Sequence, residues 1–292
     1  MAGKVHLTKE TWCALLVRTD GPALIRIAIH VGIVLFLALL ISLQPPYWPA
    51  LIIPQGVMLI FLFAPLHECI HDTAFKSTRC NRLVAIVCGW LLLLPPAWFR
   101  YYHLNHHRFT NDPSRDPELT TLKPLNRRDH LIYMTGLTTW WRQLLVLLRN
   151  AFGRNRDEFI PRKAHRRITV EAALFIAAYG IAYQIFGDAV YLMWVVPALI
   201  GQPFLRAFLL AEHLNCPDTR DMTVNSRTTV TNLLVRWLTW NMSFHAEHHY
   251  QPAVPFHKLP LFHQYLRPQL QVIHKGYFDL NRDHWSRLTW RN

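Results

Sequence analysis

The chain has 292 residues, of which 51% are hydrophobic, 13% aromatic and only 17% charged. Soluble domains average about 25% charged residues, so this composition favours a membrane protein. The formal net charge of +13 would suit nucleic acid, but the basic residues are not interleaved with aromatic ones, and no nucleic-acid partner is predicted. Five cysteines without a CxxC pair argue against a disulfide framework or a thiolate zinc site.

Four apolar segments are long enough to cross about 30 Å of hydrocarbon, which takes roughly 20 helical residues each. They form two hairpins joined by short turns and cover residues 23–43, 49–68, 168–186 and 189–213. Prolines 45 and 46 with Tyr47 and Trp48 end the first segment, as expected at a membrane boundary. His30 and Arg206 are the obvious titratable groups inside the spans, and we interpret both as packing or snorkelling residues.

The basic residues predict the topology. No Lys or Arg occurs from residue 27 to 75, or from residue 168 to 205. By the positive-inside rule both termini face the cytoplasm, and the cytoplasmic parts are residues 1–22, 72–167 and 214–292. We therefore expect a single multi-pass domain over residues 1–292.

Two shorter apolar stretches differ from the spans. Residues 83–94 are followed by Pro95 and Pro96 and are too short to cross a bilayer, which indicates a re-entrant or interfacial helix. Residues 129–152 mix apolar positions with tryptophans and arginines, which predicts one amphipathic helix lying at the interface.

Eight of the 17 histidines fall into three short motifs, HECIH, HLNHH and HAEHH. Offsets of three and four residues place side chains on one face of a helix, so each motif can aim its imidazoles at one point. Eight nitrogen ligands exceed what one four-coordinate zinc uses, so two metal ions are indicated. The motif histidines are His67, His71, His103, His106, His107, His245, His248 and His249.

His213 ends the fourth span on the same predicted membrane face as the three motifs. A histidine at such a position is often a capping or interfacial residue. Its depth, equal to that of His67 and His71, favours a ninth ligand instead.

At these residues the chain resembles the membrane fatty acid desaturase superfamily, particularly its short bacterial members. The stretches LLPPAWFRYYHLNHHRFTNDPSRDPEL and NMSFHAEHH, followed by PFHKLP, carry the resemblance beyond the histidines. It implies an all-α integral membrane fold whose four transmembrane helices form two hairpins under a cytoplasmic helical cap. It also implies a non-haem di-iron site in that cap, with O2 as co-substrate, and a location in a bacterial inner membrane. The eight motif histidines and His213 would be the iron ligands.

Carboxylates adjacent to a ligand or following the second motif are candidates to orient imidazole N–H groups. Asn241, four residues before His245, could reach the site from one helical turn away. A surface or salt-bridge role is the alternative for each of them. The candidates are Glu68, Asp112, Asp116, Glu212, Asn241 and Glu247.

The resemblance favours a fatty acyl desaturase acting on a lipid. A hydroxylase or ketolase of a carotenoid or alkane, or a desaturase of a small amino-acid-derived molecule, remains open, because these reactions share the same iron chemistry. The chain has no GxGxxG or haem-binding pattern, so we expect an external electron carrier, a ferredoxin or cytochrome b5 with its reductase.

Two other classes compete. HECIH also fits the HExxH pattern of an intramembrane zinc protease, in which the glutamate acts as general base. That reading leaves most of the aligned histidines without a role. A metal transporter or store would need a polar path through the spans, which the sequence does not offer.

Overall fold

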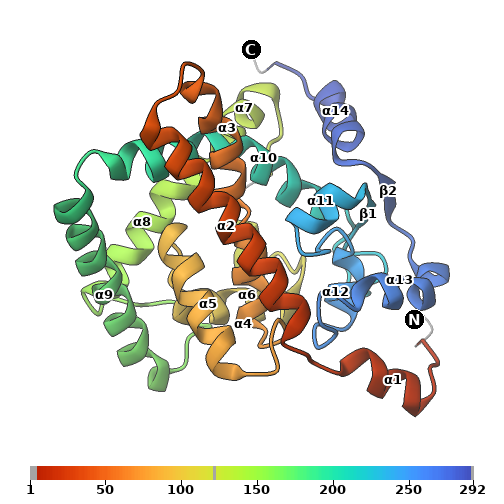
Figure 1. Ribbon diagram of the computed structural model, residues 1–292. Coiled ribbons are helices and arrows are strands. Elements are labelled where there is room, and N and C mark those ends of the chain that lie inside the picture. The colour runs from red at the N-terminus through yellow and green to blue at the C-terminus, as the bar shows by residue number, and fades with distance from the viewer. Residues whose placement is uncertain (1–4, 121–122, 291–292) are drawn as a thin grey trace.

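The computed structural model describes residues 5–120 and 123–290, and the chain there is almost entirely helical (Figure 1). The N-terminal helices are α1 (Lys9–Leu16), α2 (Gly21–Leu43), α3 (Trp48–Ile60), α4 (Phe63–Ile70), α5 (Thr78–Leu91) and α6 (Pro96–Phe109). The central helices are α7 (Arg127–Thr135), α8 (Leu137–Ala151), α9 (Arg162–Phe186) and α10 (Val196–His213). The C-terminal elements are β1 (Thr228–Val230), α11 (Leu233–Leu238), α12 (His245–Tyr250), α13 (Leu259–Leu266), β2 (Ile273–Lys275) and α14 (Tyr277–Arg287). Short 3₁₀ turns occur at Pro117–Thr120 and Arg267–Gln269, and a π-helical turn at Tyr191–Val195 precedes α10.

Four helical stretches in the described residues have the length and apolar composition of membrane spans, which confirms the all-α prediction with four candidate spans. They are Lys9–Leu43, Trp48–Ile70, Arg162–Phe186 and Tyr191–His213. The second stretch is divided at Phe61 and Leu62, where α3 ends and α4 begins.

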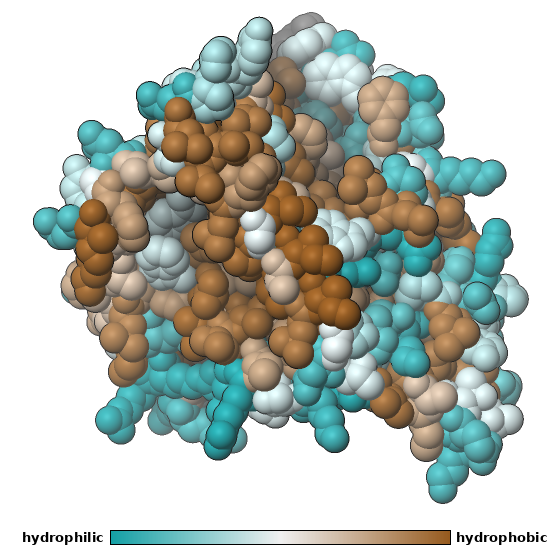
Figure 2. Space-filling model, in the orientation of Figure 1, coloured by the Kyte–Doolittle hydropathy of each residue, from teal (hydrophilic) through white to brown (hydrophobic). Residues whose placement is uncertain are grey.

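Large apolar side chains are exposed along α2 and its neighbours, where water would penalise them. Figure 2 shows them as a brown area over the middle of the molecule, bordered by hydrophilic residues along its lower edge and right side. Exposed apolar patches of this extent mark contact with lipid or with another protein. On α2 they include Ile25, Ile29, Leu35, Phe36, Leu39 and Leu43.

The spans pack through a close backbone approach. A Cβ atom on Gly56 of α3 would lie 2.1 Å from the carbonyl oxygen of Pro197, so only glycine fits there. Gly201 of α10 meets α3 in the same way, because its Cβ would lie 2.3 Å from the Gly56 oxygen. Small residues allow membrane helices to pack this closely. His30 of α2 donates to the Met58 carbonyl of α3 at 2.7 Å, so this buried histidine is a packing residue as expected.

Of the two shorter apolar stretches, the first agrees with its prediction and the second does not. Helices α5 and α6 meet at an angle of 98°, so the chain bends sharply at the prolines, consistent with a re-entrant segment or a broken fifth span. The expected single helix over residues 129–152 is wrong, since Gly136 separates α7 from α8. Gly136 has φ +67°, and a Cβ there would meet the Gln202 side chain at 2.4 Å. A left-handed residue ends one helix and redirects the chain into the next.

The C-terminal part covers the histidine-bearing helices. Strands β1 and β2 pair in parallel, with Thr228 opposite Ile273. Helices α12 and α13 pack against each other and α12 contacts β1, which fixes the HAEHH motif beside the ends of α4, α6 and α10 (Figure 1).

Candidate metal centre

All nine histidines singled out from the sequence come together in two groups. One group joins α4, α6 and α12, and the other joins α6, α10 and α12. In each group one ring nitrogen per residue lies within 4.8 Å of the same kind of atom on every other member. The first group is His67, His71, His103, His107 and His248, and the second is His106, His213, His245 and His249.

Helix geometry explains why the HLNHH motif serves both groups. His103 and His107 are four residues apart and lie on one face of α6, with their Nε2 atoms 2.9 Å apart. His106 is turned by about 100° from His107, as adjacent helical residues are, and faces the second group instead. A motif on one helix can therefore reach two neighbouring metal positions.

Hydrogen bonds in the second group direct two ring nitrogens at each other. His106 donates from Nδ1 to the Asp116 carboxylate at 3.0 Å, and His213 donates from Nδ1 to the Asn225 carbonyl oxygen at 3.0 Å. A neutral imidazole has one N–H, so the Nε2 atom of each ring then carries a lone pair. These two Nε2 atoms lie 3.2 Å apart. Two lone pairs facing each other at this distance repel, and either a shared proton or a metal ion between the two nitrogens would offset that repulsion.

His249 repeats this arrangement. The Thr110 hydroxyl donates to the His106 carbonyl oxygen at 2.9 Å, so it can accept from His249 Nδ1 at 3.1 Å. The Nε2 atom of His249 is buried without a hydrogen-bond partner among the described residues, as is that of His71. The donor set thus fits metal ions of the kind that imidazole binds.

Burial favours the neutral, ligand form of most of these imidazoles. His106 is the exception, because burial lowers its pKa but Glu118 and Asp116 raise it by more. Desolvation lowers the pKa of His248 and of His249 well below its usual range, and the neighbouring histidines add to this effect. Neutral imidazoles bind metal without first losing a proton.

Three of the carboxylates proposed to orient the histidines lie beside one of them. Asp116 bonds to His106, and Glu212 lies 3.3 Å from His245 Nδ1. Glu68 is 3.9 Å from His248 Nδ1, and its other oxygen accepts from the backbone N–H of Phe256 at 3.1 Å.

The other three candidates, Asp112, Asn241 and Glu247, contact residues other than the nine histidines in the described structure. Asp112 bonds to Ser114 and Arg115 near the surface. Asn241 donates to the Phe256 carbonyl oxygen at 3.0 Å, although we expected it one turn from the site. Glu247 accepts from Thr228 at 2.6 Å and contacts His263. Adjacency to a ligand in the sequence points a helical side chain about 100° away from it, which explains the outcome for Glu247.

Glu118, which was not among the residues expected from the sequence, also lies at the site. Its carboxylate lies 3.3 Å from His103 Nδ1 and 3.6 Å from His106 Nε2, so it touches both groups. Burial raises the pKa of this carboxyl group. It follows Asp116 by two residues, so the acidic run after the second motif was the signal that could have found it.

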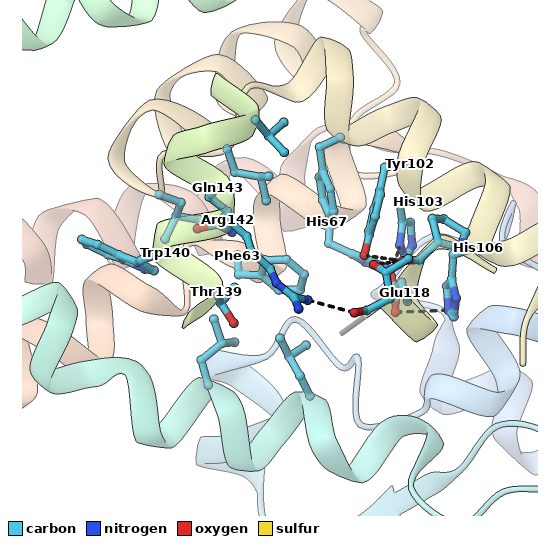
Figure 3. Close-up of a pocket in the computed structure, with 18 of the residues that line it drawn as sticks. Phe63, His67, Tyr102, His103, His106, Glu118, Thr139, Trp140, Arg142 and Gln143 are labelled. Atoms are coloured by element: carbon cyan, nitrogen blue, oxygen red, sulfur yellow. Dashed lines mark hydrogen bonds and ion pairs between the residues drawn. The ribbon is translucent and has the colours of Figure 1, made fainter. Parts of the chain in front are cut away.

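A cavity of about 610 Å³ opens beside the histidines. Figure 3 shows His67, His103 and His106 at one end and Thr139, Trp140 and Gln143 of α8 at the other, with Phe63 between them. Its volume lies within the range of about 300–1,000 Å³ typical of small-molecule sites. Its walls combine aromatic and aliphatic side chains with several charged ones, and it gives a substrate access to the histidine groups.

Known proteins match this chain over most of its length. The family model described as fatty acid desaturase matches residues 42–281. A sphingolipid delta(4)-desaturase of Drosophila melanogaster is 26% identical over 80% of this chain and 69% of its own length. A sphingolipid delta(4)-desaturase/C4-monooxygenase of Rattus norvegicus is 25% identical over 77% of this chain and 65% of its own length. A fatty acid desaturase of Bacillus subtilis (strain 168) is 25% identical over 76% of this chain and 69% of its own length.

These relatives extend beyond the region they share with this chain, so their individual substrates do not carry over directly. The family match spans every histidine of the two groups and three of the four candidate spans, and it includes only residues 42 and 43 of the first span. The helical fold with its membrane-type spans agrees with it. The chain is an oxidoreductase that belongs to the fatty acid desaturase family.

Proposed function

We propose that the two histidine groups each hold an iron ion and that the protein is an O2-dependent lipid oxidase, foremost a fatty acyl desaturase. The observation that supports this most directly is the gathering of nine histidines into two groups, in each of which one ring nitrogen per residue lies within 4.8 Å of those of the other members. Iron is favoured over zinc because zinc has no redox chemistry. When bound, the two irons would use O2, two electrons and two protons to remove two hydrogen atoms from adjacent methylenes, leaving a C=C bond and two water molecules.

The protein's own residues would hold and shield this centre. Asp116, the Asn225 carbonyl and Thr110 fix the Nδ1 protons of His106, His213 and His249. The fixed tautomers leave each Nε2 free for a metal ion. Phe63 and Phe99 stack beside His67 and His103 and keep water from that side of the site.

The cavity would bind the substrate. Its aromatic and aliphatic wall can hold an alkyl chain against the histidines, and the groups at its far end can hold a polar head. A chain fixed at both ends presents the same methylenes to the metals at each turnover.

Hydroxylation is the second candidate. The rat relative is named as both a desaturase and a C4-monooxygenase, so one such scaffold supports both outcomes. The two reactions differ in whether the substrate loses a second hydrogen or gains oxygen. The zinc-protease reading is disfavoured, because Glu68 accepts hydrogen bonds from Thr73 and from the Phe256 backbone instead of facing an open site.

The membrane topology and the electron supply belong to the same proposal. The spans and the Lys and Arg distribution support a multi-pass protein with both termini and the metal centre in the cytoplasm, in a bacterial inner membrane. A net charge of +13 would attract an acidic carrier, a ferredoxin or cytochrome b5 with its reductase. If the purified protein turned over with NAD(P)H alone, the need for a separate carrier would be refuted.

The test is iron reconstitution followed by product analysis. Protein purified in mild detergent and loaded with ferrous iron should bind about two irons per chain, and with O2 and reduced ferredoxin it should convert a lipid to a product two mass units lighter. A product sixteen units heavier would identify the hydroxylase. One tightly bound zinc, with no activity after iron loading, would contradict the proposal.

A further inference from the structure

The cavity contains a buried arginine that has no acidic partner among the described residues. Arg206 of α10 is 7% exposed and lines the cavity wall. Its Nη1 atom donates to the Thr139 hydroxyl at 3.2 Å, and its Nε atom is buried without a partner. Of the packing and snorkelling roles expected from the sequence, this burial against α8 fits packing.

We propose that Arg206, with Thr139 and Gln202, forms a subsite for the carboxylate of an amphiphilic substrate. This inference rests on the proposed function, since it places the substrate head at one end of the cavity and its oxidised carbon at the other.

The other charged groups of the cavity are already engaged. Arg149 pairs with Asp157 at 2.5 Å, and Lys123 donates to the His213 carbonyl oxygen at 2.7 Å. Arg142 donates to the Thr120 carbonyl oxygen at 2.9 Å.

The acidic side chains of the cavity face the histidines. Asp116 and Glu118 lie against His106 and His103, and Glu212 lies against His245. Glu212 is near enough to interact electrostatically with Arg206, but neither it nor the other two forms an ion pair with Arg206 in the parts of the chain that the structure describes. Burying a charge is costly unless it is paired, so an anion is the partner that this guanidinium lacks.

Gln202 provides the second observation. Its side chain is fully buried and lines the cavity, yet neither its Oε1 nor its Nε2 atom has a hydrogen-bond partner among the described residues. Gln202 lies four residues before Arg206, so both side chains occupy the same face of α10. An amide donor beside a guanidinium matches the two oxygens of a carboxylate.

The position of the subsite sets the class of substrate. His213 lies seven residues after Arg206 on the same face of α10, which places it about 10 Å along the helix axis at 1.5 Å per residue. A carboxylate bound at Arg206 would therefore have an alkyl chain running toward the histidines. A cavity of about 610 Å³ suits one such chain rather than a whole two-chain lipid. The substrate class is a free aliphatic carboxylic acid oxidised at a carbon well removed from its carboxylate.

The experiment uses a decanoate that carries a photoreactive diazirine at its far end, with iron-loaded protein in lipid nanodiscs. Labelling of cavity peptides is measured by mass spectrometry while unlabelled decanoate or methyl decanoate competes. Decanoate should compete at roughly tenfold lower concentration than the ester, the scale expected for one charge-assisted hydrogen bond. In R206Q the advantage of decanoate over the ester should disappear, while R206K should keep most of it. Arg282→Gln, which removes an exposed arginine outside the cavity, is the charge-matched control and should behave as wild type.

Several results would overturn the proposal. One is equal competition by decanoate and methyl decanoate in the wild-type protein. Another is an R206Q variant that still prefers decanoate as strongly as the wild type does. If R206Q fails to fold, Thr139→Val takes its place as the test variant. It should reduce the preference for decanoate over methyl decanoate severalfold. Photolabelling needs no turnover, so it separates the two proposals. A carboxylate preference without iron or product would contradict only the proposed function, and lipid oxidation without that preference would contradict only this inference.

Discussion

The Nε2 atom of His213, the last residue of α10, lies 2.9 Å from the Nε2 atom of His245, the first residue of α12. A histidine outside the three motifs thus faces a motif histidine at a distance that calls for a shared proton or a metal ion between the two rings. This contact motivates the first prediction. His213→Ala should remove one ligand of the second group and abolish product formation with little loss of folded protein.

The measurements for His213→Ala are iron content and product formed per folded protein. His274→Ala is the control, because His274 is half-buried and bonds to the nearby Gly276 carbonyl oxygen. That control should retain both irons and full activity. Two bound irons with wild-type turnover in His213→Ala would show that the three motifs hold the metals without it.

Asp116 should tune metal affinity through His106. The buried carboxylate accepts a hydrogen bond from His106 Nδ1 and another from the backbone N–H of Asn111 at 2.8 Å. Loss of such an orienting partner typically lowers metal affinity by about 10–100-fold. We expect Asp116→Asn to fall in this range when iron is titrated against a competing chelator. Asp112→Asn should leave the affinity unchanged, because Asp112 contacts only neighbouring residues near the surface in the described structure.

His263 is a structural residue in spite of its position in the C-terminal tail. From the sequence alone we expect alanine to be tolerated there, since it lacks the spacing of the motifs. The structure places its Nδ1 atom against the fully buried carboxylate of Glu247, which also accepts from Thr228. His263→Ala would leave that carboxylate short of a donor and should destabilise the fold by about 1–3 kcal/mol. Thermal unfolding of the variant in detergent tests this, and a midpoint equal to wild type would restore the original expectation.

His257 should make the fold sensitive to acid. Burial lowers the pKa of this histidine to about 4, with smaller effects from Lys258 and Arg26. The unfolded chain therefore binds a proton at a higher pH than the folded protein does. The stabilisation is fully present above about pH 6.5 and is lost as the pH falls toward 4.

The check on His257 is a comparison of unfolding midpoints at several pH values. His257→Gln should lose less stability between pH 7 and 4 than the wild type, while the two should differ little in slope above pH 7. Parallel curves across the acid range would refute the assignment. Because His257 is partly exposed, solvent screening will reduce the effect below that of a fully buried group.

The sequence by itself determined the features that depend on local spacing. Offsets of three and four residues fix which histidines share a helical face, and roughly 20 apolar residues fix a candidate span. The family, the helical class and the nine gathered histidines could therefore be predicted from the order of the amino acids. The break at Gly136 could not, because its left-handed conformation is selected by packing against Gln202.

Only the tertiary structure decided how these pieces combine. His106 and His107 are neighbours in the chain but join different groups, and their partners come from α4, α10 and α12. Glu118 reaches the site while Asn241 turns away from it. For Arg206 the sequence left packing and snorkelling open, whereas the structure places it beside a cavity with its guanidinium bonded to Thr139 of α8. The physical reason is that side-chain burial and charge pairing depend on contacts between residues far apart in the chain, which local periodicity does not encode.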